Sequence, residues 1–437
     1  MSSLVEVRLW GRTIGSIHCP PGQQYAFFQY APEFVASGIE VSPLMMPLSH
    51  QVYAFPELAF PTFHGLPGLV ADSLPDRFGN AVIDAWLSRQ GREAASFSAL
   101  ERLCYTGTRG MGALEFFPLI ENTAPDNQIL DVAHLVSLAS EVLRNRKEGF
   151  NDTFLHEGDD AEIKKIFQIG ASAGGARAKA VIAWNPQTQE VRSGQVEAGS
   201  GFQYWLMKFD GVSGSGDKEL ADPQGFTNIE YAYSILAQKV GIHMSSCRLF
   251  SEGGRHHFMT QRFDRTQEGS KIHMQSLGAL AHYDFNMAAA YSYEQAFSVL
   301  ERLGCPMEQK EQLFLRMVFN IVMRNQDDHV KNISFLMDRK GTWSLAPAYD
   351  LTFSYQKGGQ WTGRHQMSMN GKRDGFTRVD FMDCAATVGV MASHAKELLS
   401  RVQALCTQWL QVADEAGVDR RYSETIFKEF RVFKNHI

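Results

Sequence analysis

Cysteine, long apolar runs and excess positive charge are all scarce in this sequence. Its 437 residues include six cysteines, and none of them stands in a C-x-x-C pair. This spacing argues against a zinc site or a disulfide framework and fits a reducing compartment. The net charge of −6 at pH 7 gives no broad basic surface for direct binding of nucleic acid. Residues 1–13 lack the apolar core of a secretory signal, and no apolar run is long enough to span a bilayer. We therefore expect a cytoplasmic protein without a membrane partner.

The most informative stretch covers residues 323–351, MRNQDDHVKNISFLMDRKGTWSLAPAYDL. Before it, apolar residues recur at helical spacing over 313–322 and predict a helix with one buried face. Within it, two alternating runs on either side of the turn residues 338–341 predict a β-hairpin. A hairpin returns the chain to where it left, so we expect Asp350, after the second strand, to approach Asn332, before the first.

Three polar residues of this stretch have the spacing of a phosphotransferase site. Asp327 and Asn332 have the offset that separates the catalytic Asp from the metal-binding Asn in the kinase motif H-R-D-x-x-x-x-N. Asp327 would act as the base, and Asn332 and Asp350 would hold Mg²⁺ through oxygen atoms. Asp328 has the wrong offset by one and is disfavoured. A solvated loop with capping side chains is the structural alternative, which the D-x4-N spacing alone does not exclude.

Two glycine-rich stretches differ in what they indicate. GASAGGARAK, residues 170–179, separates predicted strands at 164–170 and 179–184, and its glycines would let backbone N–H groups approach phosphates. It lacks the G-x-x-x-x-G-K-[ST] pattern, which disfavours P-loop NTPase chemistry and leaves a flexible hairpin tip as the ordinary interpretation. Ser172 in it is either a solvated turn serine or a phosphoacceptor. GTRGMG, residues 107–112, is expected to be a simple turn before a strand.

A lysine and a glutamate follow in the order seen in kinases. Lys208 lies near the end of an alternating strand, 202–210, where it either reaches solvent or contacts ATP phosphates. A helix is predicted over 227–242. Thr227 and Glu230 fit a capping box, T-x-x-E, and we favour that role for Glu230 over a pairing with Lys208, because it needs no long-range contact.

The remaining sequence completes a two-lobed pattern. Residues 248–250 and 257–263 read as a strand hairpin, and the QRFDR stretch at 261–265 lies where a hinge would meet adenine. After it the pattern is mostly helical. The polar stretch ENTAPDNQ at 121–128 reads as a linker.

Four stretches, GASAGGARAK, QRFDR, QDDHVKN and PAYDL, resemble the HipA family of bacterial serine/threonine kinases, the toxins of type II toxin–antitoxin systems. The resemblance covers nearly the whole chain, including LPDRFG and GTRGMG. It implies an α+β, two-lobed protein-kinase-like fold with an additional β-rich N-terminal subdomain and a mostly helical C-terminal lobe. We assign residues 1–125 to the N-terminal subdomain, 126–265 to the kinase-like N-lobe and 266–437 to the C-lobe.

The resemblance also implies roles for individual residues. Asp327 would be catalytic, Asn332 and Asp350 would bind Mg²⁺, and Ser172 matches the autophosphorylated serine. Lys208 would contact the phosphates and Asp264 would face the ribose. The residues implied in ATP binding are Gly174, Gly175, Ala176, Arg177, Ala178, Lys179, Lys208, Gln261, Arg262, Phe263, Asp264, His329, Lys331, Asn332, Tyr349 and Asp350.

This chain departs from the usual family pattern at several of these positions. Arg177 and Ala178 replace Gln and Glu in the loop, which bears on substrate preference and on Ser172 regulation. Gln326 stands where Gly is common and Asp328 where Ala is common. Gln261 replaces an acidic hinge residue, which matters little if its backbone bonds adenine.

The implied activity is transfer of the ATP γ-phosphate to a serine of a cytosolic protein, in known members an aminoacyl-tRNA synthetase, which inhibits translation and growth. Autophosphorylation of the loop serine silences such enzymes. A helix-turn-helix antitoxin of the HipB type binds the toxin, so that DNA is contacted mainly through the antitoxin. Two alternatives stay open: a small-molecule kinase on the same scaffold, and an ATP-binding, non-enzymatic corepressor.

Overall fold

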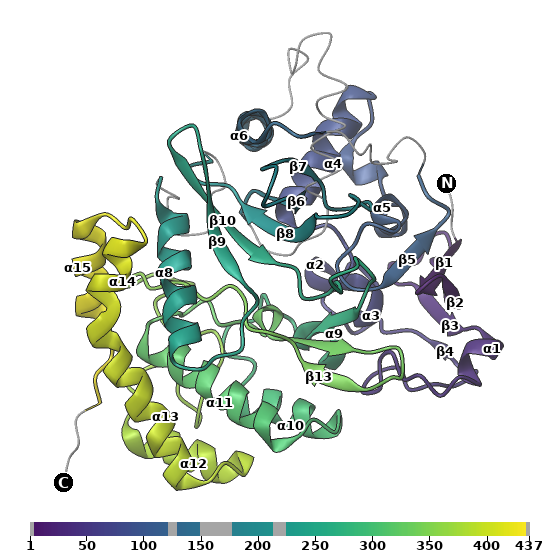
Figure 1. Cartoon of the computed structure of the whole chain (residues 1–437). Coiled ribbons are helices and arrows are strands. Elements are labelled where there is room, and N and C mark those ends of the chain that lie inside the picture. Colours follow the sequence, from purple (N-terminus) through teal and green to yellow (C-terminus); the bar gives the residue numbers. More distant parts are fainter. Residues whose placement is uncertain (1–3, 121–128, 149–176, 213–223, 434–437) are drawn as a thin grey trace.

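In the computed structural model, the described residues form three β-sheets and a helical C-terminal lobe (Figure 1). The structure describes residues 4–120, 129–148, 177–212 and 224–433. No helix within these ranges is long and apolar enough to cross a membrane. The predicted strand at 164–170 and the greater part of the 170–179 loop lie outside the described residues.

The N-terminal sheet has five antiparallel strands in the order β4-β3-β2-β1-β5. Val5, Val7 and Leu9 alternate with more exposed residues along β1, so that one face of the strand enters the core. This confirms the β-rich start expected from the sequence. The strands are β1 (Leu4–Leu9), β2 (Arg12–His18), β3 (Phe27–Tyr30), β4 (Val52–Tyr53) and β5 (Leu114–Phe117).

Short helices connect this sheet to the rest of the molecule. The longest before residue 120 is α4, whose N-terminus is capped by Asp76: its carboxylate accepts a hydrogen bond of 2.6 Å from the Gly79 N–H. The helical elements are α1 (Pro32–Val35), α2 (Phe60–Phe63), α3 (Gly68–Ala71), α4 (Arg77–Arg89), the 3₁₀ turn η1 (Ala94–Ser96), α5 (Ala99–Thr106) and, further on, α6 (Val132–Glu148).

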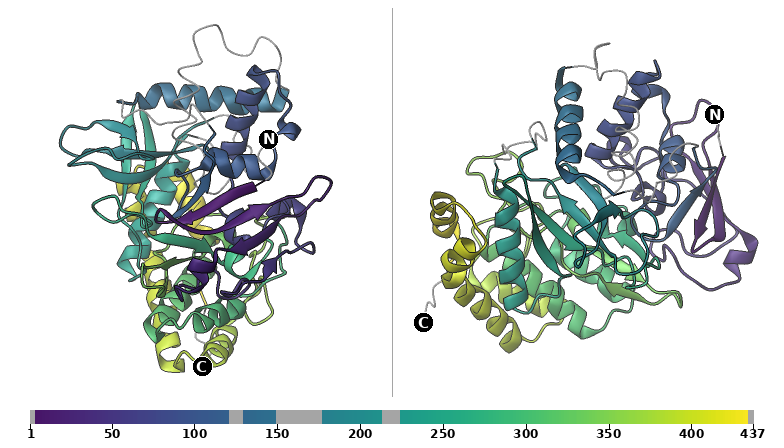
Figure 2. Two further views of the ribbon diagram at one scale, coloured as in Figure 1. Left: turned by 90° about the vertical axis from the view of Figure 1, so that its right-hand side faces the viewer. Right: turned by 45° about the horizontal axis from the view of Figure 1, so that its top comes forward.

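The second sheet forms the N-lobe, with strand order β7-β6-β8-β10-β9. Met207 on β8 joins a hydrophobic cluster with α4 and α6, which cover one face (Figures 1 and 2). The next residue, Lys208, points to the opposite face, where α8 (Phe226–Lys239) packs on β9 and β10. The strands are β6 (Lys179–Trp184), β7 (Val191–Ser193), β8 (Gln203–Lys208), β9 (Cys247–Glu252) and β10 (Arg255–Gln261).

The hairpin predicted after residues 326–332, which we call the predicted catalytic loop, is confirmed, and the structure adds a third strand to it. β12 (Ser334–Met337) pairs with β13 (Trp343–Leu345) and also with β11 (His273–Ser276), which the sequence analysis missed. β11 has only four residues, HMQS, and no clear alternation of apolar and polar residues. Its pairing is therefore decided by the neighbouring strand and not by its own pattern.

The C-lobe is built around α11 (Met307–Val322), in which every residue from 313 to 322 is buried. The prediction of a single buried face was wrong, because helices from both sides enclose this one. Even Arg316 and Asn320 are inside. The other helices are α9 (Leu277–Ala281), α10 (Tyr293–Arg302), the 3₁₀ turn η2 (Val330–Asn332), α12 (Arg378–Val388), α13 (Ala392–Leu405), the 3₁₀ turn η3 (Cys406–Gln408), α14 (Trp409–Glu415) and α15 (Arg420–Glu429).

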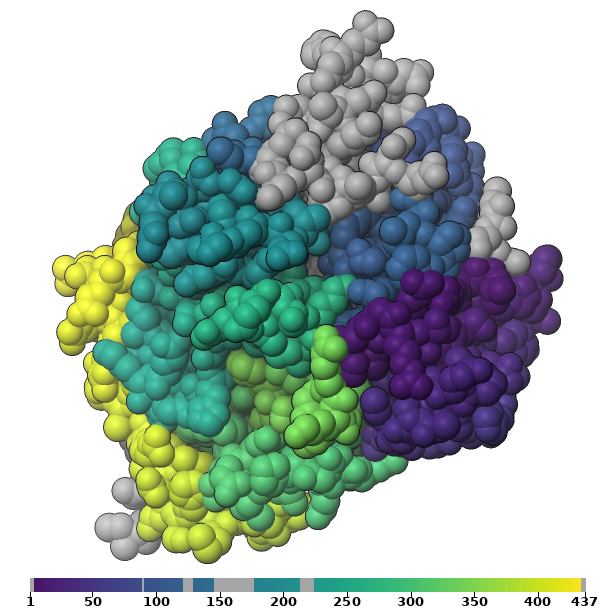
Figure 3. Space-filling model, turned by 45° about the vertical axis from the view of Figure 1, so that its right-hand side comes forward, coloured from purple at the N-terminus to yellow at the C-terminus, as the bar shows by residue number. Residues whose placement is uncertain are grey.

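The N-terminal subdomain packs against the C-lobe hairpin. The Trp343 indole N–H on β13 donates to the Glu40 carbonyl at 3.0 Å, and the Gln275 amide on β11 donates to the Val41 carbonyl at 3.0 Å. Figure 3 shows this contact as the purple N-terminal surface lying against the green of the hairpin. The two regions share one hydrophobic core cluster.

A buried ionic group, which we call the hinge clamp, joins the GTRGMG turn to the chain just after β10. It consists of Asp264, Arg262, Arg265 and the backbone N–H of Gly112. The Asp264 carboxylate is fully buried and lies 2.7 Å from Arg262 Nη2, 2.8 Å from Arg265 Nη1 and 2.7 Å from the Gly112 nitrogen. Burial alone would raise the pKa of Asp264, but the two guanidinium groups hold it well below its usual value.

Removing Asp264 should therefore destabilise the protein strongly. Asp264→Ala leaves two buried guanidinium groups without their counter-charge, which costs about 3–5 kcal/mol of unfolding free energy. Chemical denaturation measures the loss. Glu424→Ala is the matched control, because its ion pair with Arg420 is exposed and contributes about 1 kcal/mol or less. An unchanged denaturation midpoint for Asp264→Ala would show that the clamp does not hold the fold.

Candidate active site

The ammonium group of Lys208 lies between two carboxylates from distant parts of the chain. Its Nζ is 2.6 Å from Oε1 of Glu230 on α8, and it also donates to Oδ1 of Asp350, which follows β13. A strand, a helix and the segment after the hairpin therefore meet at one charge. The sequence order Lys208, Glu230, Asp350 corresponds to a single cluster in space.

The capping role favoured for Glu230 was wrong. The N-cap of α8 is Gly225, and the helix has no side-chain cap. Thr227 donates its hydroxyl hydrogen to the His256 carbonyl at 2.5 Å instead. Glu230 is 1% exposed and so would be costly to bury without the Lys208 charge, which explains why the long-range ion pair forms.

Burial and charge act in opposite directions at this cluster. Burial lowers the pKa of Lys208, but Asp350 and Glu230 together raise it above its ordinary value. Burial also opposes ionisation of Asp350, whereas Lys208 and then Lys179 lower its pKa to about 2. Burial raises the pKa of Glu230. Around neutral pH the charged Lys208 and Asp350 therefore face each other.

The predicted catalytic loop contains two adjacent aspartates with opposite surroundings. The Asp328 side chain is 1% exposed and accepts hydrogen bonds from the Tyr293 hydroxyl at 2.7 Å and from the Gln366 N–H at 2.8 Å. Its Oδ2 also lies 2.8 Å from His365 Nδ1. The Asp327 side chain is 30% exposed. The geometry therefore agrees with the choice of Asp327, and not Asp328, as the residue available to a substrate.

Asn332 is held beside this loop by its own side chain. Its Nδ2 donates to the Asp327 carbonyl at 2.8 Å, which turns the amide oxygen away from that carbonyl. The Tyr349 hydroxyl donates to the Lys331 carbonyl at 2.5 Å, and Asn325 Nδ2 lies 3.4 Å from the Asp350 carbonyl. These contacts connect Tyr349 and Asp350 to Lys331 and Asn325 on either side of the predicted catalytic residue.

The donor atoms of Asn332 and Asp350 suit Mg²⁺, because an amide oxygen and a carboxylate are hard oxygen ligands. The described part of the chain holds no group of three or more His, Cys, Asp or Glu residues arranged for a metal. A site with few protein ligands fits Mg²⁺ that is shared with phosphates and water. The carboxylate of Asp350 also brings a negative charge that Lys208 only partly balances, since Glu230 competes for it.

Several residues predicted to bind the nucleotide have other contacts in the structure. Lys179 Nζ lies 3.3 Å from Oδ2 of Asp76, and the Arg177 guanidinium lies 4.0 Å from the Phe226 ring centroid. The Ala178 side chain is buried in the hydrophobic cluster formed by α4, α6 and one face of the N-lobe sheet. Ser172, Gly174, Gly175 and Ala176 lie outside the described residues.

Aromatic rings surround the other predicted ligands. The rings of Phe263 and Tyr349, from opposite lobes, have centroids 5.6 Å apart. The Lys331 ammonium lies 4.8 Å from the Phe285 ring centroid, and the His329 ring is 5.9 Å from that of Phe285. The structure therefore brings His329 and Lys331 together, and Phe263 with Tyr349.

The expectation that Asp264 faces the ribose needs correction. Both carboxylate oxygens are engaged in the hinge clamp, and the side chain is 0% exposed. Arg262 is buried in the same clamp. Their role in this structure is to attach the N-terminal turn to the hinge, because two guanidinium groups and an N–H outcompete a solvated hydroxyl for a buried carboxylate.

Two aspartates of the N-terminal subdomain were not identified from the sequence as part of this region. Asp76 pairs with Lys179, as described, and Asp72 accepts hydrogen bonds from the Ser276 N–H and hydroxyl at 2.7 and 2.8 Å. Asp72 also lies 4.0 Å from Lys331 Nζ. Asp76 lies in the LPDRFG stretch, which in the sequence carries only a resemblance to the HipA family and no predicted contact.

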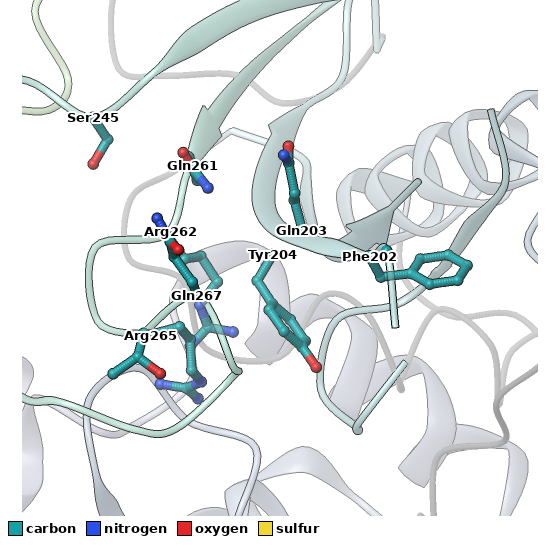
Figure 4. A pocket seen from close by; sticks show the side chains of 10 residues that line it. Phe202, Gln203, Tyr204, Ser245, Gln261, Arg262, Arg265 and Gln267 are labelled. Atoms are coloured by element: carbon teal, nitrogen blue, oxygen red, sulfur yellow. The ribbon is translucent and has the colours of Figure 1, made fainter. Parts of the chain in front are cut away.

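A cavity of about 570 Å³ lies at the hinge (Figure 4). Gln261 and Arg262 line it together with Tyr204, Ser245 and Gln267, among others. Lys208 and Asp327 do not line it. It therefore borders the predicted adenine end of the site and is separate from Lys208 and Asp327.

The fold and the arrangement of Lys208, Glu230, Asp327 and Asp350 define a kinase-like protein. Comparison with known families identifies the family to which it belongs. A family model described as HipA-like C-terminal domain matches residues 171–410, and one described as HipA N-terminal domain matches residues 5–117. The chain belongs to the HipA family.

Individual relatives agree with this assignment. HipA of Shewanella oneidensis MR-1, solved with HipB and operator DNA, superposes with a TM-score of 0.64 at 16% identity, covering 97% of this chain and 94% of that one. Two proteins named as putative kinases are each 28% identical: Y4mE of Sinorhizobium fredii, over 154 residues or 32% of this chain, and one from Haemophilus influenzae, over 175 residues or 35%. These alignments span 36% and 51% of the two relatives.

The two aspartates should respond differently to truncation. Asp328→Ala leaves a buried tyrosine hydroxyl, a backbone N–H and a histidine without their acceptor, which should cost about 3 kcal/mol of unfolding free energy. Asp327→Ala, at a more exposed side chain, should cost about 1 kcal/mol or less. Urea denaturation of both variants checks this. Equal losses would contradict the division between a structural and an accessible carboxylate.

Proposed function

We propose that this protein is an ATP- and Mg²⁺-dependent serine/threonine protein kinase and the toxin of a type II toxin–antitoxin system. The observation that carries the proposal is the Lys208 ammonium held between Glu230 and Asp350, with the more exposed Asp327 on the neighbouring loop. Membership of the HipA family and two relatives named as kinases support it. We propose three parts, residues 1–125, 126–265 and 266–437. Helix α4 of the first part packs on the sheet of the second.

The chemistry would use each residue in one role. Lys208 neutralises phosphate charge, and Phe263 and Tyr349 border the adenine. Asn332 and Asp350 would hold Mg²⁺, which supplies further neutralisation of the transferring phosphate. Asp327 orients the acceptor hydroxyl and takes its proton. His329, Lys331 and Lys179 add positive or polarisable groups around the phosphates.

The proposed acceptor is a serine of a cytosolic protein, an aminoacyl-tRNA synthetase being the family precedent, so that phosphorylation would inhibit translation. Regulation by phosphorylation of Ser172 belongs to the same proposal. The proposed partner is a helix-turn-helix antitoxin of the HipB type, through which DNA is contacted. The similarity in fold to a HipA solved with HipB and operator DNA supports that partner.

The test is phosphate incorporation from Mg²⁺-ATP, measured by intact mass and phosphopeptide analysis. Wild-type protein should gain phosphate on Ser172 or on a protein of a cell extract. Asp327→Asn should lower the rate by at least about a hundredfold, because it removes the base, while ATP affinity changes by about twofold or less.

Asp383→Asn is the matched control, since it makes the same chemical change at an exposed position on α12. Undiminished transfer by Asp327→Asn would refute the site assignment. Phosphate on a small metabolite alone would favour the small-molecule kinase. Nucleotide binding with no transfer to any acceptor would favour the corepressor.

A further inference from the structure

Residues 361–366, which follow Asp350 along the chain, contact three consecutive residues of the catalytic loop. Each contact is a hydrogen bond to a different loop residue. They are Gln326 Nε2 to the Thr362 carbonyl at 3.0 Å, Trp361 Nε1 to Asp327 Oδ1 at 2.8 Å, and the Gln366 N–H to Asp328 Oδ1 at 2.8 Å. We call residues 361–366 the loop-holding segment.

The loop-holding segment is itself fixed at its end and near its start. His365 lies 2.8 Å from the buried Asp328, and the Gln366 side chain donates back to the Trp361 carbonyl. Upstream, the Ser354 N–H donates to the Arg324 carbonyl at 3.1 Å, and the Gln326 N–H donates to the Ser354 carbonyl at 3.2 Å. The far end of the segment is therefore anchored to Asp328, and the Gln366 side chain connects the Trp361 backbone to that end.

The chemistry of this contact is specific. An indole N–H is a donor only and carries no charge, so it stabilises the ionised carboxylate of Asp327 and cannot exchange roles with it. Because the bond uses Oδ1, it fixes the rotation of the carboxylate and directs Oδ2 away from the indole. A base that must accept a proton from an acceptor hydroxyl needs both an ionised state and a fixed direction.

We propose that Trp361 is the positioning residue for the base of phosphoryl transfer, an inference that rests on the proposed kinase function. In the step it serves, the acceptor oxygen forms a bond to the γ-phosphorus while the bond from that phosphorus to the β–γ bridging oxygen breaks. ADP leaves with that electron pair. The hydroxyl proton passes to Asp327, whose other oxygen keeps the indole hydrogen bond.

The deciding variant is Trp361→Phe, which keeps an aromatic ring and removes the N–H. Release of phosphate from Mg²⁺-ATP, with water as the acceptor, and phosphate incorporation into the chain are followed at about pH 8. We expect kcat to fall about tenfold or more, with KM for ATP changed by about twofold or less.

Trp10→Phe is the matched control. Its indole N–H also donates one hydrogen bond, to the Lys271 carbonyl at 2.9 Å, and the residue is likewise half-buried. It lies between β1 and β2 of the N-terminal sheet, far from Asp327 in sequence. It should lose a similar amount of stability and keep the wild-type kcat and KM. Trp361→His, which retains a ring N–H donor, should recover part of kcat at about pH 8.

The outcomes separate the two ideas. A wild-type protein that binds ATP and transfers no phosphate overturns the proposed function, and this inference with it. An active wild type whose Trp361→Phe variant has an unchanged kcat overturns the role of Trp361 alone. A rise in kcat would also overturn it, since the indole would then restrain the base. If Trp361→Phe unfolds, the Trp361→His variant decides through its kcat and its KM for ATP.

Discussion

The ion pair network of Lys208 is the interaction on which the rest of the site depends. Glu230 and Asp350 come from α8 and from the segment after β13, and the buried Glu230 would not be stable at this position without a positive charge. One ammonium group therefore sets the distance between the N-lobe sheet, the helix packed on it and the C-lobe. It also leaves two carboxylates around one cation, an arrangement that favours a further positive ion.

In the predicted catalytic loop, the neighbouring residues Asp327 and Asp328 have different surroundings. Asp328 is enclosed by Tyr293, His365 and the Gln366 backbone, and so fixes the loop in the core. That fixed point allows Asp327, one residue earlier, to be more exposed and still have a defined direction. Adjacent identical residues can thus have different environments, because burial and hydrogen bonding act on each side chain individually.

The N-terminal subdomain contributes more than an attached surface. Its GTRGMG turn supplies the Gly112 N–H to the hinge clamp, Asp76 pairs with Lys179 and Asp72 reaches Ser276. The first two of these contacts end at Asp264 and Lys179, which the sequence predicts to bind nucleotide.

Local pattern was enough to predict much of this protein. Alternation and turn residues identified β8, the β9–β10 hairpin and the β12–β13 hairpin, and the D-x4-N spacing singled out Asp327 and Asn332, because these signals depend on residues close in sequence. The short strand β11, the burial of α11 on all sides, the pairing of Glu230 with Lys208 and the enclosure of Asp264 were decided by tertiary structure. Each depends on a partner many residues away, whose free energy of burial or ionic contact exceeds the local preference for a cap, a surface face or a solvated loop.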